Sequence, residues 1–155
     1  MINESCNLQF KEWNKNLNIK TAQNPFNIMD PLFNIRNMIK EMILLEDHLN
    51  IPAQYCPDCI VKHLLKCEAL AEEAISLDGG ENKFLYNLPT IVKEWHTAWL
   101  NEIEPTIVAS YIRKTRKSLM PIITQFSKNI VANGGSIKEV SSLIREISEH
   151  SQKTL

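Results

Sequence analysis

Residues 56–67 read CPDCIVKHLLKC, which places three cysteines and one histidine within twelve residues. On a helix, the steps of three, four and four residues put Cys56, Cys59, His63 and Cys67 on one face. One zinc ion cannot bind all four side chains. At about 1.5 Å rise per residue, Cys56 and Cys67 lie roughly 16 Å apart along the axis, whereas zinc ligands sit about 2.0–2.3 Å from the metal. The spacing therefore lets Cys56, Cys59 and His63 converge and leaves Cys67 to pack.

A tetrahedral zinc site needs a fourth ligand, and His48 is the nearest candidate in the sequence. It stands at the end of an expected helix and is joined to Cys56 by a short linker that can fold back. We call His48, Cys56, Cys59 and His63 the Cys/His cluster. Its two thiolates and two neutral imidazoles would balance the charge of one Zn²⁺, and the amides at a helix N-terminus favour thiolates. The cluster predicts a zinc-stapled helical hairpin.

Two other interpretations of the cluster stay open. In the first, Cys56 and Cys59 are free thiols, and His48 caps a helix C-terminus, where a histidine is favourable without metal. In the second, the chain is a thiol-disulfide oxidoreductase with Cys56 as nucleophile and Cys59 as resolving thiol. A thioredoxin-type site follows a buried strand, and residues 46–55 do not form one in our prediction.

The rest of the chain predicts an all-α fold, a helical bundle of about five helices. A helix opens at Asp30-Pro31 and ends near residues 48–50, and a second runs from Pro57 to the Gly79-Gly80 stop. Further helical segments are expected at about 89–120, divided near Pro105, and from Pro121 to about Asn133. The last helix starts with the Ser136/Glu139 capping box. Its expected inward stripe consists of Ile137, Val140, Ile144 and Ile147.

Length and composition indicate one domain. The chain has 155 residues and a formal charge of −1, so no global field attracts it to nucleic acid or anionic lipid. We expect an N-terminal arm over residues 1–28, loosely ordered, and a single helical domain over 29–155. No secretory leader or membrane span is expected, because no apolar run approaches about 18 residues. The four cysteines are too few and too clustered for a secreted disulfide framework. These features predict a reducing, aqueous compartment such as the cytoplasm.

Other groups of residues in the sequence give weaker evidence for a functional site. Arg113, Arg116 and Lys117 share one helical side and form the only dense basic patch, which we expect to be solvated or salt-bridged rather than to bind nucleic acid. Trp95 and Trp99, four residues apart, are expected in the core. Di-iron, metalloprotease and phosphate-loop motifs are absent from the sequence.

Residues 44–49 (LLEDHL), 56–60 (CPDCI), Lys62-His63 and 68–74 (EALAEEA) carry a resemblance. This combination resembles small helical CPDC/KH-containing proteins of large DNA viruses and marine phages. The similarity covers roughly residues 30–80, with Ile112-Arg113 and Arg116-Lys117 as further matching positions. It implies a viral protein, a minor virion component, with the Cys/His cluster as the shared feature.

The sequence thus predicts a non-enzymatic, zinc-binding helical structural or interaction protein. The expected cofactor is Zn²⁺, and the expected partner is another protein or a second copy of the chain. The alternative function is that of a thiol-disulfide oxidoreductase using Cys56 and Cys59.

Overall fold

The secondary structure of the protein was obtained from a computed structural model, which describes residues 27–152. It consists of helices α2 (Asp30–Asn50), α3 (Pro57–Asp78), α4 (Lys83–Leu100), α5 (Pro105–Ser118), α6 (Met120–Ala132) and α7 (Ile137–Gln152), with a 3-10 turn η1 (Pro52–Gln54). No strand occurs within residues 27–152. The all-α prediction is confirmed. The expected arm over residues 1–28 lies almost entirely outside the described residues.

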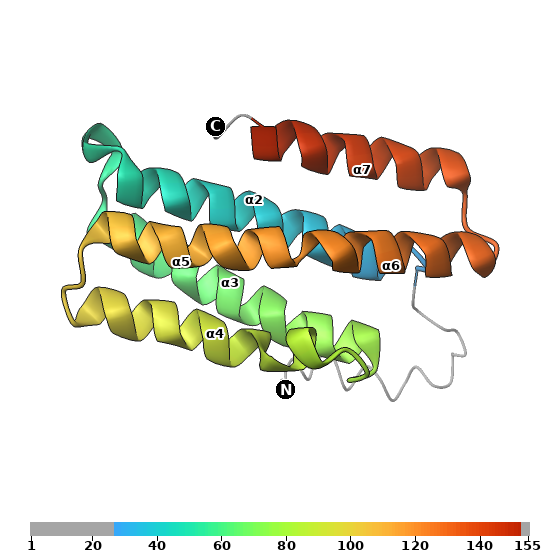
Figure 1. Ribbon diagram of the computed structural model, residues 1–155, viewed down its shortest axis with the longest axis horizontal. Helices are drawn as coiled ribbons and strands as arrows, with labels where there is room; N and C mark the ends of the chain where they lie inside the picture. The colour runs from blue at the N-terminus through green and yellow to red at the C-terminus, as the bar shows by residue number, and fades with distance from the viewer. Residues whose placement is uncertain (1–26, 153–155) are drawn as a thin grey trace.

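Helix α2 is the central element of the bundle. It packs against α3, α5, α6 and α7, while α4 lies on α3 and α5 (Figure 1). Helices α5 and α6 run end to end, separated only by Leu119, so that the six described helices form five rods. Pro121 stands in the first turn of α6, where its missing amide hydrogen costs nothing. The two halves of this long rod therefore pack on α2 one after the other.

The core follows from the apolar stripe of α2. Leu32, Ile35 and Ile39 are completely buried, and the stripe faces four other helices. Trp95 of α4 is 2% exposed and fills the layer between α4 and its neighbours. Burial of such side chains contributes about 1.5–3 kcal/mol each and explains why α2 lies at the centre.

Local signals set most helix ends where the sequence predicts them. Cys56 is the N-cap of α3, and Gly79 ends this helix in the left-handed conformation with φ of 77°. Ser136 Oγ accepts a hydrogen bond from the Glu139 amide at the start of α7 (3.2 Å). The first helix begins one position away from expectation, since Met29 rather than Asp30 is its N-cap.

The start predicted for the third helical segment is wrong. Helix α4 begins at Lys83 and carries Pro89 in its interior. Asn82 Oδ1 accepts a hydrogen bond from the Leu85 amide (3.1 Å) and so caps the helix six residues earlier than expected. Leu85 and Leu88 are fully buried, and their packing offsets the hydrogen bond that Pro89 cannot donate.

The inward stripe of α7 also differs from the prediction. Val140 and Ile147 are buried and Ile144 is partly buried, but Ile137 is 66% exposed. Leu143, which is not part of the predicted stripe, faces inward and is 5% exposed. The first turn of α7 therefore leaves Ile137 outside the core, and the heptad pattern alone does not decide burial there.

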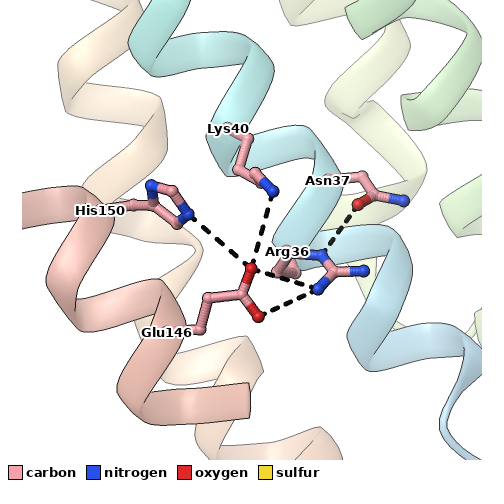
Figure 2. A network of polar contacts seen from close by, with 5 residues as sticks. All are labelled: Arg36, Asn37, Lys40, Glu146 and His150. Carbon is pink, nitrogen blue, oxygen red and sulfur yellow. Dashed lines mark hydrogen bonds and ion pairs between the residues drawn. The ribbon is translucent and has the colours of Figure 1, made fainter.

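Helix α7 is held on α2 by a polar network around Glu146 (Figure 2). Glu146 accepts from Arg36 at 3.0 Å, and Lys40 and His150 lie 3.6 and 3.7 Å from its carboxylate. Burial by itself would raise the pKa of Glu146, but the charges of these three residues outweigh it and hold the pKa below its ordinary value. The network links the two helices electrostatically.

The variant Glu146→Gln should therefore lower the stability modestly and in a pH-dependent way. A lowered folded pKa stabilises the protein fully above the unfolded pKa of about 4.3, and this contribution is lost as the pH falls through the folded pKa. The side chain is 36% exposed, so solvent screening limits the effect to about 0.2–1 kcal/mol. Urea denaturation at neutral pH should show this loss, and at pH values below the folded pKa the difference from the native chain should vanish. Glu149→Gln, an exposed site on the same helix, serves as control. A pH-independent loss would contradict the prediction.

No helix among the described residues combines the length and apolar character needed to cross a bilayer.

Candidate metal centre

The Cys/His cluster lies at one end of the α2/α3 hairpin. His48 is in the last turn of α2, and the chain then passes through η1 to Cys56, the N-cap of α3. Cys59 lies in the first turn of α3, and His63 follows one turn later. The short connection folds back as the sequence predicts, so the end of α2 and the start of α3 form one corner of the bundle (Figure 1). All four cluster residues belong to these two helix ends.

The two cluster sulfurs are joined as a disulfide. Cys56 and Cys59 have Cα atoms 5.2 Å apart, and the Cys59 amide donates to Cys56 Sγ at 3.2 Å. Both residues are half-buried. The free amides of the first turn and the positive end of the helix dipole face this pair, which favours thiolates once the disulfide is reduced. The chemistry available at this helix end is that of a dithiol/disulfide couple.

The two cluster histidines lie against one another. Their rings stack with centroids 5.3 Å apart and planes inclined by 22°. His48 Nδ1 is 2.8 Å from the carbonyl oxygen of Gln54, and His63 Nδ1 is 2.6 Å from Glu41 Oε1. Because a carbonyl and a carboxylate can only accept, each Nδ1 carries a proton. When such a ring is neutral, its lone pair is on Nε2. Histidines that ligate metals have such an outer partner in nearly all cases.

The structure thus brings the predicted residues together in two pairs, one of sulfurs and one of imidazoles. Cys59 and His63 are one helical turn apart on α3, which makes the pairs neighbours. With the sulfurs bonded to each other, no group of three or more His, Cys, Asp or Glu side chains within residues 27–152 is arranged to hold a metal ion. The zinc-stapled hairpin is therefore not the form described by the structure. Zinc ligation by this cluster remains a prediction about the reduced chain.

Sequence reasoning missed the outer partners of the two imidazoles. Glu41 lies seven residues before His48 and so on the same face of α2, a spacing that could have pointed to it. The Gln54 carbonyl carries no such signal, because it depends on the path of the chain through η1. Both groups orient the histidines without belonging to the set of ligands.

Cys67 behaves as the packing residue that the sequence predicts. Its side chain is fully buried between the hairpin helices. Burial, with a smaller contribution from the charge of Glu41, raises the pKa of this thiol to about 12. A thiol with so little thiolate is a poor nucleophile and a poor metal ligand. Cys67 does not compete for chemistry at the cluster.

The basic patch expected on α5 lacks one of its three residues at the surface. Arg116 points inward and is 4% exposed. Its guanidinium nitrogens Nε and Nη2 donate to the two carboxylate oxygens of Glu46 on α2, at 2.7 and 2.9 Å. Arg113 and Lys117 remain on the outer side of the helix. The sequence predicts that these three cations are solvated or salt-bridged. Arg116 is salt-bridged, but its partner is a buried carboxylate on the facing helix, so it does not share the outer face with the other two.

A hollow lined by apolar side chains and Glu102 opens next to the cluster. It has a volume of about 390 Å³ and lies between the η1 connection and the turn from α4 to α5. Tyr55, the residue before Cys56, forms one wall, and Trp99, Leu100 and Ile103 form others. Tyr55 and Leu100 are 45% and 62% exposed. The path of the chain at the cluster therefore positions a wall of this hollow.

Comparison with known proteins finds no match among family models, curated proteins or solved structures.

Proposed function

We propose that the protein is a non-enzymatic helical structural or interaction protein whose α2/α3 hairpin is held, in its reduced state, by one zinc ion. The proposed ligands are the four residues of the Cys/His cluster. The observation that carries this proposal is the orientation of the imidazoles. Both Nδ1 atoms are already occupied by oxygen acceptors, which leaves two Nε2 atoms, on rings that stack, for metal ligation.

The spacing of the rings supports a shared ion. Two imidazoles bound to one tetrahedral zinc, with Zn–N bonds of about 2.0–2.1 Å, have ring centroids roughly 5 Å apart. The His48 and His63 centroids are 5.3 Å apart. Two thiolates complete the tetrahedron and neutralise the ion, which matches the half-buried setting of Cys56 and Cys59.

A zinc site with four protein ligands is a structural site. Catalytic zinc sites have three protein ligands and keep a position for water or substrate, whereas the cluster offers four donors around one corner. A zinc ion there would set the angle between α2 and α3 and the position of Tyr55 at the hollow. The exposed apolar surface beside Tyr55 supports a role in contacts with another protein. The resemblance to viral proteins adds the proposal of a minor virion component in a reducing setting.

Zinc binding by the reduced chain is the direct test. Protein purified under reductant should hold about one equivalent of zinc by elemental analysis, and chelation should lower its melting temperature. Cys59→Ser and His63→Ala should lose the metal. Cys67→Ala and His96→Ala, which change residues outside the cluster, should retain it. A reduced chain that binds no zinc would overturn the proposal.

Glu41 offers a sharper variant of this test. Loss of an outer partner of a metal-bound histidine weakens metal affinity about 10–100-fold. Glu41→Gln should therefore still bind zinc, but more weakly than the native chain in a competition with a chelating dye. Glu68→Gln, on the neighbouring helix and paired with Lys93 instead, should have unchanged affinity.

A second candidate function is favoured by the disulfide itself. A half-buried Cys56–Cys59 pair at a helix N-terminus is the arrangement of a thiol-disulfide oxidoreductase. In that case Cys56 attacks the substrate and Cys59 resolves the mixed disulfide. Turnover of a disulfide substrate with glutathione, by a reduced chain without zinc, would favour this function over the first.

A further inference from the structure

We propose that the Cys/His cluster is redox-gated: oxidation of Cys56 and Cys59 to a disulfide releases the zinc ion, and reduction allows it to rebind. This inference rests on the zinc site proposed above. It follows from one juxtaposition, namely that the same two sulfurs needed as zinc ligands are bonded to each other in the structure, while the two imidazoles stay side by side.

The backbone accommodates the disulfide form without loss of the hairpin. The Cα atoms of Cys56 and Cys59 are 5.2 Å apart, within the usual range for disulfides of about 4.4–6.8 Å. Cys56 still caps α3 and accepts from the Cys59 amide. The three-residue step that places both sulfurs on one zinc ion also lets them bond. Both states therefore fit one fold.

The histidines are held by groups that oxidation does not touch. His48 is anchored by the Gln54 carbonyl and His63 by Glu41, so neither ring depends on a sulfur for its position. After oxidation two nitrogen donors remain, which is too few for a stable structural zinc site. Reduction restores the two missing thiolates beside a preformed imidazole pair. This arrangement makes release and rebinding reversible.

The chemistry balances with hydrogen peroxide as the two-electron oxidant. One thiolate attacks a peroxide oxygen, so that an S–O bond forms and the O–O bond breaks, and the leaving hydroxide takes a proton to become water. The second thiolate attacks the sulfenic sulfur: the S–S bond forms, the S–O bond breaks, and a second hydroxide takes a proton. Two protons and one peroxide are consumed, and two waters and one free Zn²⁺ are produced.

Cys67 does not provide an alternative partner for either sulfur. It is fully buried on α3, and its thiol has little thiolate character. Cys56 and Cys59, by contrast, are both half-buried and within reach of a small oxidant. Oxidation at this corner is therefore directed to one pair.

The test uses the full chain loaded with zinc and titrated with hydrogen peroxide. Released zinc is followed with a metallochromic dye and free thiols with a thiol reagent. We expect one zinc released for every two thiols lost, a Cys56–Cys59 bond by peptide mass mapping, and rebinding of zinc after treatment with a phosphine reductant. Cys67→Ala should release zinc in the same ratio.

The outcomes separate this inference from the function it rests on. If the reduced chain binds no zinc, the proposed function fails and the gate fails with it. If zinc binds but stays bound through peroxide treatment, only the gate is overturned. The gate is also overturned if zinc leaves without the Cys56–Cys59 bond, for example with sulfinic acids or with a bond to Cys6 or Cys67.

Discussion

Replacing Arg116 by alanine should lower the free energy of unfolding by about 3–5 kcal/mol, because the change leaves an unpaired carboxylate inside the bundle. Arg116 and Glu46 are each about 5% exposed in their side chains. Two hydrogen bonds, at 2.7 and 2.9 Å, join them in a side-by-side arrangement across the α2/α5 interface. Urea denaturation monitored by circular dichroism measures the loss.

The cost of breaking the Arg116–Glu46 ion pair must be compared with the cost of removing both charges. Lys114→Ala changes an exposed cation on the same helix and should alter stability by no more than about 0.5 kcal/mol. The double variant Glu46→Leu with Arg116→Met replaces both charges by apolar groups and should recover most of the loss. A cost of less than 1 kcal/mol for Arg116→Ala, on the order of a surface ion pair, would show that the pair is hydrated in solution.

Trp95→Ala should be comparably damaging, with an expected cost of about 3–5 kcal/mol. Trp95 is 2% exposed and is the largest of the fully buried side chains. Its removal leaves a cavity between α4 and the rest of the bundle that Leu88 and Val92, themselves packed, cannot fill. Thermal and urea unfolding of the variant provide the measurement.

Two aromatic residues of the same helix calibrate this prediction. Tyr86 is 64% exposed, so Tyr86→Ala should stay within about 0.5 kcal/mol. Trp99 is only partly buried at the wall of the hollow, and Trp99→Ala should fall between the two. The sequence alone predicts both tryptophans in the core. Equal losses of unfolding free energy for Trp95→Ala and Trp99→Ala would therefore contradict the different burial of these two side chains in α4.

The Cys/His cluster could be predicted only as far as residue spacing along one helix decides where side chains lie. The steps between Cys56, Cys59 and His63, and the short return from His48, brought two pairs of the right residues to one corner. Glu41 lies 22 residues from His63 in the chain, and no local pattern joins them. The oxidation state of the sulfurs is likewise not a property of spacing, since the same geometry serves thiolates and a disulfide.

Helix α4 shows where local signals compete. Pro89 is typical of the first turn of a helix, and the sequence therefore predicts a start there. Asn82, however, caps the helix further upstream. The burial of Leu85 and Leu88 makes this longer helix the stable one. In α7 the apolar repeat was correct for Val140 and Ile147 and wrong for Ile137. Periodicity defines a face of a helix, but not whether every turn of that face is covered by other helices.

Local signals in the sequence suffice to predict a helix ending near Gly79, a break before Pro105, and two cysteines and two histidines at the first hairpin. Capping groups, proline and glycine act within a few residues, so these features need no partner. Helix packing, in contrast, is what turns Arg116 inward to Glu46, 70 residues away, and brings Glu41 to His63. Such contacts depend on which helices pack together, and a buried charge finds its partner only after they have done so.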